Sequence, residues 1–364
     1  MGILGAGNVL PAYLQVLDRL TPRGDAAVGP VCARRRETWD ELRARRPGLE
    51  LVEDARGVVE SDADVVVIIT PPESHTALAR LALEHGKHVL VEKPLAATRS
   101  EAEPLVELAV ARGLLLVAAP FVQLSPTFRA YWAQICGGAI GRVHSARALY
   151  GNAGSTWARW YHDGKVGPLA EVGIYNLKSL TALLGPVEEV QAAEATAVAS
   201  RRIGDIEIAK PDPDVSHIIL RHVSGALSSI ASSHAIQRYR RPGLEVYGTE
   251  GTANLLGDDW DPRGFEIWRN AAERWEEYEA IEPTWNWADG LRELVLALRQ
   301  GRPPRADLDH DLHLIDVIEA AGKAARDRRA VRVASRFGPL DLAPEESRAV
   351  VHHLHDHTRP ADEQ

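Results

Sequence analysis

The sequence contains little cysteine, no long apolar run and no excess of basic charge. Only two cysteines, Cys32 and Cys136, occur among the 364 residues, which argues against a disulfide framework and fits a reducing compartment. No apolar stretch approaches the ~20 residues of a membrane-spanning helix, and we expect no signal peptide before the first strand. A net charge of -9 argues against an extended nucleic-acid surface. We therefore expect a soluble cytoplasmic protein that binds neither nucleic acid nor a membrane.

Strand and helix patterns alternate through the first third of the chain. Residues 65–69 form a β-branched run that Pro71 and Pro72 close, which is typical of a strand buried on both faces. A helical pattern follows over residues 75–85, with Ser74 as a candidate N-cap. Alternating strands and helices predict an α/β domain over residues 1–118, a Rossmann fold with a doubly wound parallel sheet.

Strand patterns with short turns dominate the rest of the chain. Helices are expected at about 126–135, 168–185, 287–300 and 308–326, whereas residues 188–255 are mostly strands. These patterns predict an α+β domain with a largely antiparallel sheet over residues 119–364. The run HHLHDH at 352–357 has a metal-like composition, but its place near the end favours a solvated helix end, so no metal site is predicted.

A glycine-rich turn opens the first strand–helix unit. GAGNVL at residues 5–10 supplies the first two glycines of G-x-G-x-x-G. Gly5 permits a tight turn, and Gly7 lets the backbone approach a pyrophosphate at the helix N-terminus. Leu10 stands where the third glycine is usual, so the close packing of helix on strand must be achieved differently. By itself, the match of two glycines is explained equally well by any tight strand–helix turn. Its position at the start of an α/β domain favours cofactor binding by the turn, including Asn8 and Val9.

The end of the second strand indicates which nicotinamide cofactor to expect. No acid follows Cys32 to bind the ribose 2′-hydroxyl of NAD; the chain continues with Ala33, Arg34 and Arg35. A guanidinium can grip phosphate oxygens and stack on adenine, which suits the 2′-phosphate of NADP. A solvated basic helix start is the alternative interpretation. The sequence thus favours NADP(H) over NAD(H).

Residues 69–96, ITPPESHTALARLALEHGKHVLVEKPLA, resemble the Gfo/Idh/MocA oxidoreductases, the group of glucose–fructose oxidoreductase and inositol dehydrogenase. Members carry a T-P-x-x-x-H segment, a G-K-H-V strand and an E-K-P motif in this order. Other segments, such as GPLAEVGIYNLKSLTALLGPVEEV and LEVYGTEGT, extend the resemblance from Gly2 to about Val333. The resemblance implies a Rossmann domain and a C-terminal open sheet whose outer face often forms dimers or tetramers. We therefore expect a homodimer or homotetramer.

The resemblance assigns the E-K-P motif to the reaction centre. It implies that Lys93 lies between the nicotinamide and the substrate hydroxyl, and that the bond to Pro94 is commonly cis. Glu92 is expected to orient or neutralise the Lys93 ammonium. A surface lysine beside a turn proline is the alternative for an isolated motif. The T-P-x-x-x-H segment is expected near the cofactor through Thr70, Pro71 and His75, although the histidine could equally be a structural hydrogen-bond partner.

A second segment departs from the family pattern D-x-G-x-H-x-x-D. Glu171, Tyr175 and Lys178 stand at its three functional positions, and their spacing predicts one helix face. Tyrosine also occurs at the histidine position in the family. We expect Tyr175 to be the proton donor or acceptor, with its pKa lowered by nearby ammonium groups. Glu171 is expected to hold a substrate hydroxyl, and Lys178 to tune Tyr175, bind an anionic substrate group or point to solvent.

Three aromatic residues precede the glycine loop and could stack on a sugar ring: Trp157, Trp160 and Tyr161. Together these observations predict hydride transfer between NADP(H) and a secondary alcohol or ketone of a sugar, cyclitol or related polyol. Two alternatives remain at this point. One is a glycosidase that uses tightly held NAD for a transient oxidation, and the other is a catalytically silent NADP sensor that regulates a protein partner.

Overall fold

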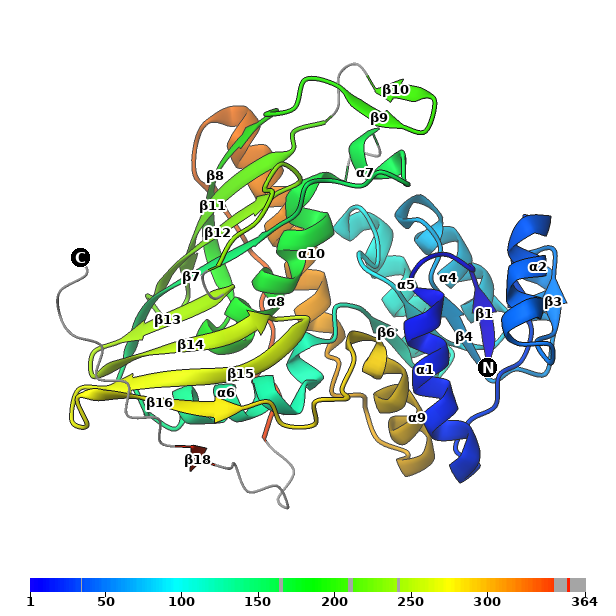
Figure 1. Cartoon of the computed structure of the whole chain (residues 1–364), viewed down its shortest axis with the longest axis horizontal. Helices are drawn as coiled ribbons and strands as arrows, with labels where there is room; N and C mark the ends of the chain where they lie inside the picture. Colours follow the sequence, from blue (N-terminus) through cyan, green and yellow to red (C-terminus); the bar gives the residue numbers. More distant parts are fainter. Residues whose placement is uncertain (34, 164–165, 209–211, 241–242, 344–351, 354–364) are drawn as a thin grey trace.

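A computed structural model describes residues 1–33, 35–163, 166–208, 212–240, 243–343 and 352–353, arranged around two large β-sheets (Figure 1). The first sheet has six strands in the order β3-β2-β1-β4-β5-β6, and all neighbouring strands are parallel. This order is that of a Rossmann fold, so the predicted doubly wound sheet is confirmed. The strands are β1 (Gly2–Leu4), β2 (Val31–Cys32), β3 (Leu51–Val52), β4 (Val65–Ile68), β5 (His88–Val91) and β6 (Leu116–Ala118).

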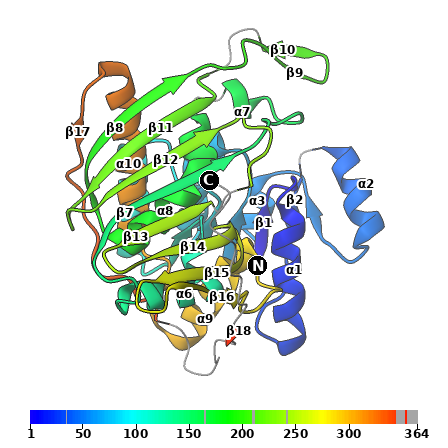
Figure 2. The same ribbon diagram turned by 60° about the vertical axis from the view of Figure 1, so that its left-hand side comes forward.

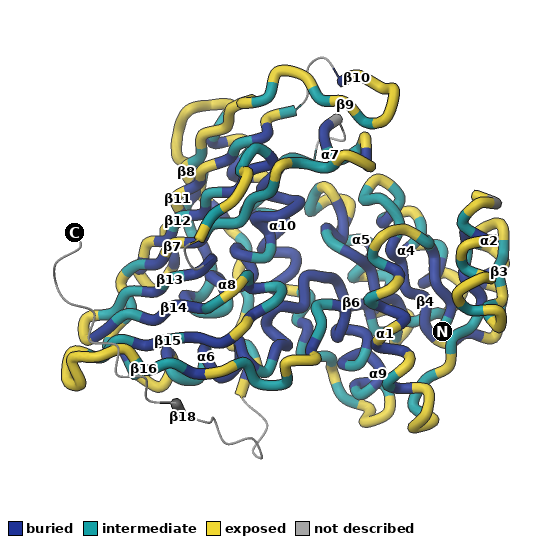
Figure 3. The backbone as a smooth tube through the Cα atoms, viewed as in Figure 1, coloured by how far each residue is buried: buried dark blue, intermediate teal, exposed yellow. Residues whose placement is uncertain are grey.

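Strand β4 shows why the β-branched run lies at the centre of this sheet. All four of its residues are buried, and successive side chains point to opposite faces. Val65 and Val67 join one core cluster, whereas Val66 and Ile68 join another on the opposite face. The buried strands run as a dark band through this part of the tube in Figure 3.

Helices from both ends of the chain cover the first sheet. The cluster on one face contains residues of α1 and α9, and the cluster on the other contains residues of α3, α4, α5 and α10. The bounds are α1 (Leu10–Leu20), α2 (Arg36–Arg45), α3 (Ala55–Val59), α4 (His75–Glu84), α5 (Arg99–Ala111), α9 (Gly290–Gln300) and α10 (Leu308–Asp327). The late helices α9 and α10 thus contribute to the core of the N-terminal sheet.

The second sheet has ten strands in the order β17-β8-β11-β12-β7-β13-β14-β15-β16-β18 (Figure 2). Only the pair β12–β7 is parallel among its neighbours, so the prediction of a largely antiparallel sheet is confirmed. The strands are β7 (Val143–Gly151), β8 (Val187–Ala195), β11 (Val215–His222), β12 (Leu227–Ser233), β13 (Leu244–Gly248), β14 (Gly251–Asp258), β15 (Asp261–Arg269), β16 (Arg274–Glu279), β17 (Val331–Arg332) and β18 (His352–His353). A separate hairpin pairs β9 (Arg201–Ile203) with β10 (Ile206–Ile208).

One face of the second sheet packs on helices, and the other lacks a cover within the described residues. Along β11, Ser216, Ile218 and Leu220 are buried, whereas His217 and Ile219 between them are exposed. This alternation is typical of a strand with one covered face. Residues of α6 (Pro126–Cys136), α8 (Ile174–Leu184) and α10 form the core on the covered face.

Two local expectations need correction. The helix expected over 168–185 begins as a π-helix, Leu169–Gly173, before α8 continues it. His352 and His353 form a short strand against β16 instead of a helix end, and residues 354–357 lie outside the described residues. Among the described helices, none is both long and apolar enough to cross a bilayer.

Candidate active site

Two adjoining cavities lie at the carboxyl ends of the parallel strands, where α1 begins. The outer cavity, of about 850 Å³, is lined by residues that include Gly5, Gly7, Ala33, Arg35, Glu53, Thr70, Pro71, Trp157, Arg159 and Trp160. The inner cavity, of about 230 Å³, is lined by residues that include Gly7, Asn8, Val9, Thr70, Pro71, Lys93, Trp157, Trp160, Glu171 and Tyr175. The shared lining residues show that the cavities meet. Ligands of open α/β sheets bind at this end of the strands.

The glycine turn fits a dinucleotide pyrophosphate. Gly5 has φ 109°, and a Cβ there would lie 2.8 Å from the carbonyl oxygen of Ile69, so β1 and β4 need glycine at this contact. A Cβ on Gly7 would meet nothing within 4 Å, so this residue faces open space. Helix α1 has no acidic residue in its first turn and no side-chain cap. Its first backbone N–H groups are therefore suited to an anion.

The outer cavity carries charges of both signs. Ala33 and Arg35 line it, as expected for residues after β2, whereas Arg34 lies outside the described residues. Glu53 and Asp54, which follow β3 and line the same cavity, were not predicted from the sequence. Their position after the strand that neighbours β2 in parallel is a signal that could have identified them.

Glu92 was expected to orient or neutralise Lys93; within the described residues its carboxylate bonds the backbone of Lys93 and not the ammonium. Its carboxylate accepts a hydrogen bond from the hydroxyl of Tyr13 at 2.8 Å and another from the backbone N–H of Lys93 at 3.1 Å. The bond between Lys93 and Pro94 is cis, as the resemblance implied. Glu92 therefore holds the end of β5 against α1 and leaves the ammonium to another partner.

That partner is Glu171, which comes from the π-helix beside the second sheet. The Nζ of Lys93 donates to Glu171 Oε1 at 2.6 Å and to the Glu171 carbonyl oxygen at 2.8 Å. Burial raises the pKa of Glu171, while the charge of Lys93 acts to lower it. The buried Oε2 of Glu171 has no hydrogen-bond partner among the described residues. The pair thus joins the two halves of the chain and leaves one carboxylate oxygen available to a ligand.

Tyr175 lies beside this pair, but the expected direction of its pKa shift is wrong. Its ring centroid is 5.6 Å from the Nζ of Lys93. Burial, followed by the charge of Glu92, raises the pKa of Tyr175 well above its usual value. The charge of Glu171 raises the pKa of Tyr175 further. The hydroxyl of Tyr175 therefore keeps its proton over the ordinary pH range and can act as a donor.

Lys178 does not belong to the site. Its side chain is 0% exposed, and its Nζ forms an ion pair with Asp311 of α10. It lines neither cavity and is buried, so two of its three expected alternatives, contact with a substrate anion and a position in solvent, are wrong. A π-helix has more residues per turn than an α-helix, so the i, i+4, i+7 spacing no longer defines one face across Glu171 and Lys178.

His75 is a structural partner and not a direct cofactor ligand. It is buried, and its two ring nitrogens lie 2.8 Å from the carbonyl oxygens of Pro94 and Thr70. It lines neither cavity, so its predicted contact with the cofactor is wrong. His75 instead connects the two loops that carry Thr70 and Lys93.

The three aromatic candidates divide between lining and support. Trp157 and Trp160 line both cavities. Tyr161 lines neither; its ring centroid lies 4.2 Å from that of His234, and its hydroxyl accepts a hydrogen bond from Asn152. The predicted contact of Tyr161 with a substrate is therefore not supported by this geometry.

Comparisons with known proteins agree with this architecture. Residues 1–119 match the model of an oxidoreductase family with an NAD-binding Rossmann fold, GFO_IDH_MocA, and residues 128–254 match the GFO/IDH/MocA C-terminal domain. The chain is similar to dTDP-3,4-didehydro-2,6-dideoxy-alpha-D-glucose 3-reductase of Streptomyces antibioticus, with 29% identity over 90% of this chain and 97% of that protein. It is also similar to trans-1,2-dihydrobenzene-1,2-diol dehydrogenase of Bos taurus, with 28% identity over 72% of this chain and 75% of that protein. A solved NAD-binding oxidoreductase of Klebsiella pneumoniae has the same fold, with a TM-score of 0.79, 21% identity, and coverage of 92% of this chain and 98% of that one.

Proposed function

Since the chain belongs to the Gfo/Idh/MocA oxidoreductase family, we propose that it transfers a hydride between NADP(H) and a secondary alcohol or ketone of a sugar, cyclitol or related polyol. The observation that carries this proposal is the convergence of Lys93, Glu171 and Tyr175 at the inner cavity. The names of the similar proteins support a sugar-like substrate, since they include a keto-sugar reductase and a diol dehydrogenase.

The residues of the outer cavity fit the cofactor. The turn at Gly5 and Gly7, with the N-terminus of α1, would hold the pyrophosphate, and Arg35 would pair with the 2′-phosphate. The nicotinamide, when bound, supplies or accepts the hydride. Thr70 and Pro71 line both cavities, so they would lie along the path between the pyrophosphate and the reaction centre.

The side chains of the inner cavity can manage the proton that accompanies hydride transfer. An ammonium has one more N–H donor than the two bonds of Lys93 to Glu171 use, so Lys93 can donate to the substrate oxygen. Tyr175 retains its proton and can deliver it to an oxygen that gains negative charge as a ketone is reduced. The free Oε2 of Glu171 can accept a hydrogen bond from a neighbouring substrate hydroxyl. This set of roles supports catalysis of ketone reduction.

An assay with a panel of keto-sugars and polyols tests the proposal. We expect the purified protein to oxidise NADPH with at least one keto-sugar, or to reduce NADP⁺ with the matching alcohol, as followed by the absorbance of the reduced nicotinamide. Sugar release from a glycoside without net cofactor reduction would instead identify the glycosidase alternative. Cofactor binding without turnover of any substrate in the panel would contradict the proposed activity and favour the sensor.

Replacing Arg35 by serine is expected to weaken NADPH binding about tenfold and to leave NADH binding nearly unchanged. The reason is that a phosphate loses its charge-assisted hydrogen bonds, whereas a ribose hydroxyl does not depend on them. Isothermal titration of both cofactors measures the effect. Arg23→Ser, on an exposed residue outside both cavities, is the matched control. Equal losses for NADPH and NADH would contradict the assignment of Arg35 to the 2′-phosphate.

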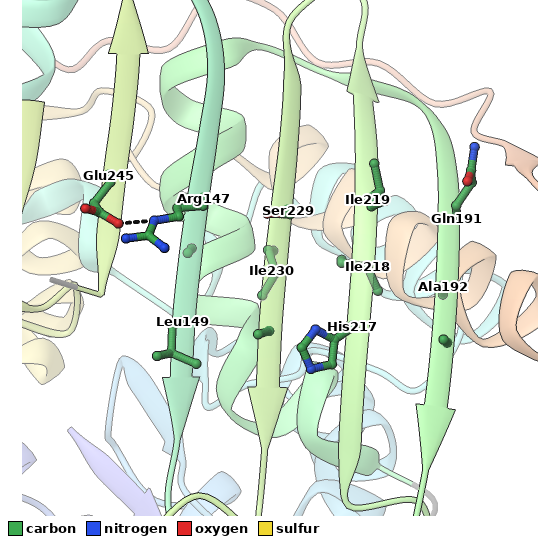
Figure 4. Close-up of a pocket in the computed structure, with 13 residues that line it drawn as sticks. Arg147, Leu149, Gln191, Ala192, His217, Ile218, Ile219, Ser229, Ile230 and Glu245 are labelled. Carbon is green, nitrogen blue, oxygen red and sulfur yellow. Dashed lines mark ion pairs between the residues drawn. The ribbon is translucent and has the colours of Figure 1, made fainter. Parts of the chain in front are cut away.

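We further propose that a second copy of the chain covers the open face of the second sheet. Figure 4 shows the residues that line a pocket on this face: Leu149 lies on the same strand as Arg147, which pairs with Glu245, whereas Ile219 and Ala192 lie on β11 and β8. Ile219 is 52% exposed, and a row of apolar side chains on an exposed sheet face is typical of an interface.

Replacing Ile219 by aspartate is expected to shift the protein from a dimer or tetramer toward the monomer, because burial of a carboxylate in an apolar interface is costly. Light scattering after gel filtration, over a range of concentrations, measures the mass. Val223→Asp is the control, since Val223 is equally exposed but lies outside this pocket. A wild-type protein that is monomeric at all concentrations would contradict the proposed interface.

A further inference from the structure

We propose that Asp259, a buried carboxylate in the turn between β14 and β15, is a positioning residue for the proton donor Tyr175. It acts through Asn176 and Ser179, which follow Tyr175 on α8, and its ionised form holds the tyrosine in place. This inference rests on the proposed function, in which Tyr175 protonates the substrate oxygen. It gives a turn of the second sheet a part in the reaction.

The helix that carries Tyr175 changes its geometry just before this residue. Residues Leu169–Gly173 form a π-helix, and α8 begins at Ile174, one position before Tyr175. The first turn of α8 contains no acidic residue, and its N-cap residue, Gly173, has no side chain to hold it. A short π-helix is a rare irregularity, so the direction of Tyr175 depends on the contacts that fix the turn after it.

Asp259 reaches this turn of α8 from the second sheet. Its Oδ2 accepts a hydrogen bond from Asn176 Nδ2 at 3.0 Å and another from Ser179 Oγ at 2.9 Å. The two donors lie one and four residues after Tyr175, so the carboxylate fixes the first turn of α8 that follows the tyrosine. All three hydrogen-bonded side chains are buried. Moving the carboxylate would leave buried polar groups unpaired, which is costly.

The same turn supports the ring of Tyr175 through a second series of contacts. Trp260, which follows Asp259, contacts Tyr150 of β7, with ring centroids 6.3 Å apart. Tyr150 in turn contacts the ring of Tyr175 edge-to-face at 5.9 Å. Neighbouring residues of one turn therefore hold both the helix that carries the tyrosine and, through Tyr150, the tyrosine ring.

The charge of Asp259 changes within the ordinary pH range. Burial raises its pKa to about 6, whereas the two hydrogen bonds from α8 act to lower it. Its titratable neighbours include Asp258 in the same turn, whose charge raises the pKa of Asp259 further, and the phenols of Tyr150 and Tyr239. Burial raises the pKa of both phenols, so they stay protonated near pH 6 and add no charge of their own.

The two oxygens of Asp259 differ in a way that links its charge to the position of Tyr175. Both hydrogen bonds go to Oδ2, whereas Oδ1 has no hydrogen-bond partner among the described residues. Oδ1 is therefore the oxygen that takes up a proton. Hydrogen bonds to a carboxylate are roughly twice as strong as those to a neutral acceptor, so protonation weakens the hold of Oδ2 on α8. Activity that depends on the position of Tyr175 should fall as the pH drops through about 6.

Steady-state kinetics of Asp259→Asn over a range of pH tests the inference. Asparagine keeps the shape of the side chain and an oxygen acceptor but removes the charge. We expect the variant to lower kcat about tenfold at pH 8, while the KM for the ketone and the Kd for NADPH stay within about twofold of wild type. It should also lack the decrease in kcat that the wild type shows as the pH falls through about 6. Asp261→Asn is the matched control, because Asp261 follows the same turn and pairs with the exposed Arg263.

A double-variant cycle separates positioning of Tyr175 from a general structural role. In the Tyr175→Phe background, Asp259→Asn should change kcat by less than about twofold, because the hydroxyl that it positions is already absent. An equal loss of kcat with and without that hydroxyl would overturn the inference, as would a wild-type pH profile in Asp259→Asn. Ser179→Ala removes one donor to Oδ2 and should lower kcat about threefold, so it tests the same contact if Asp259→Asn does not fold. A wild-type protein without turnover would contradict the proposed function, whereas an unaffected Asp259→Asn beside a slow Tyr175→Phe would contradict this inference alone.

Discussion

Replacing Lys93 by methionine is expected to lower kcat about a thousandfold while the Kd for NADPH stays within about threefold of wild type. Methionine keeps most of the length of the side chain but removes every N–H donor at the substrate oxygen. It also removes the cation that pairs with Glu171, whose pKa burial already raises. Glu171 would then take up a proton, so we expect the variant to fold. Steady-state kinetics and calorimetry with NADPH provide the two measurements.

Two further variants delimit this result. Lys87→Met is the matched control, because Lys87 precedes the same strand, and its Nζ donates to the carbonyl oxygen of Ser61 at 2.7 Å. Tyr175→Phe keeps the ring beside Lys93 but removes the proton donor, and we expect a loss in kcat of about a hundredfold or more. Wild-type rates in both Lys93→Met and Tyr175→Phe would show that neither side chain takes part in the reaction.

Local sequence patterns predicted the parallel sheet and the edge of that sheet at which the candidate site lies. The β-branched run of β4 predicted a strand buried on both faces. Successive side chains of a strand point to opposite faces, so a continuous apolar run makes both faces apolar. The glycine turn and the E-K-P motif each follow a strand of a parallel sheet, and such strands end at the same edge. Their proximity at the cavities was therefore expected from their order along the chain.

The pairing of charges could not be derived from the same patterns. Lys93 lies next to Glu92 in sequence, yet its ammonium pairs with Glu171, because Tyr13 and the backbone already occupy the carboxylate of Glu92. The predicted decrease in the pKa of Tyr175 had the wrong sign for a related reason. It counted the nearby ammonium but neither the burial of the phenol nor the carboxylates around it. Burial and charge partners both depend on contacts between distant segments.

The prediction that Lys178 shares a helix face with Glu171 and Tyr175 was wrong because of the backbone geometry. An unbroken α-helix would have placed Glu171, Tyr175 and Lys178 on one face. The π-helix before α8 changes this arrangement, and no local feature of the segment LAEVG announces it. π-helices are rare in proteins, but those that occur are often found at functional sites. Here the π-helix carries Glu171, the partner of Lys93.

The buried pair of Lys178 with Asp311 leads to the second large effect. Replacing Lys178 by methionine is expected to lower the free energy of unfolding by about 3–5 kcal/mol at pH 8, because an unpaired carboxylate would remain in the core. Asp311 pairs with Lys178, follows the buried His310 in α10, and has an Oδ2 without a partner among the described residues. Denaturant unfolding of the wild-type protein and the variant measures the difference. The double variant Lys178→Met/Asp311→Leu is expected to recover most of the loss, since it leaves no charge behind.

The pH dependence of this loss in the free energy of unfolding distinguishes an unpaired buried charge from a loss of packing. Burial raises the pKa of Asp311 to about 6, even with Lys178 beside it, whereas the carboxyl of the unfolded chain titrates near its ordinary value of 3.8. The folded state therefore binds a proton more readily than the unfolded state, so this group increases stability as the pH falls below 6. Without Lys178 the attraction that favours the ionised form disappears, and the folded pKa rises further. The destabilisation by Lys178→Met should thus be smaller at pH 5.5 than at pH 8, where either protonating Asp311 or leaving it ionised without a cation costs more free energy. A loss of equal size at both pH values would mean that Lys178 contributes only its packing, and that the pair carries no net charge interaction.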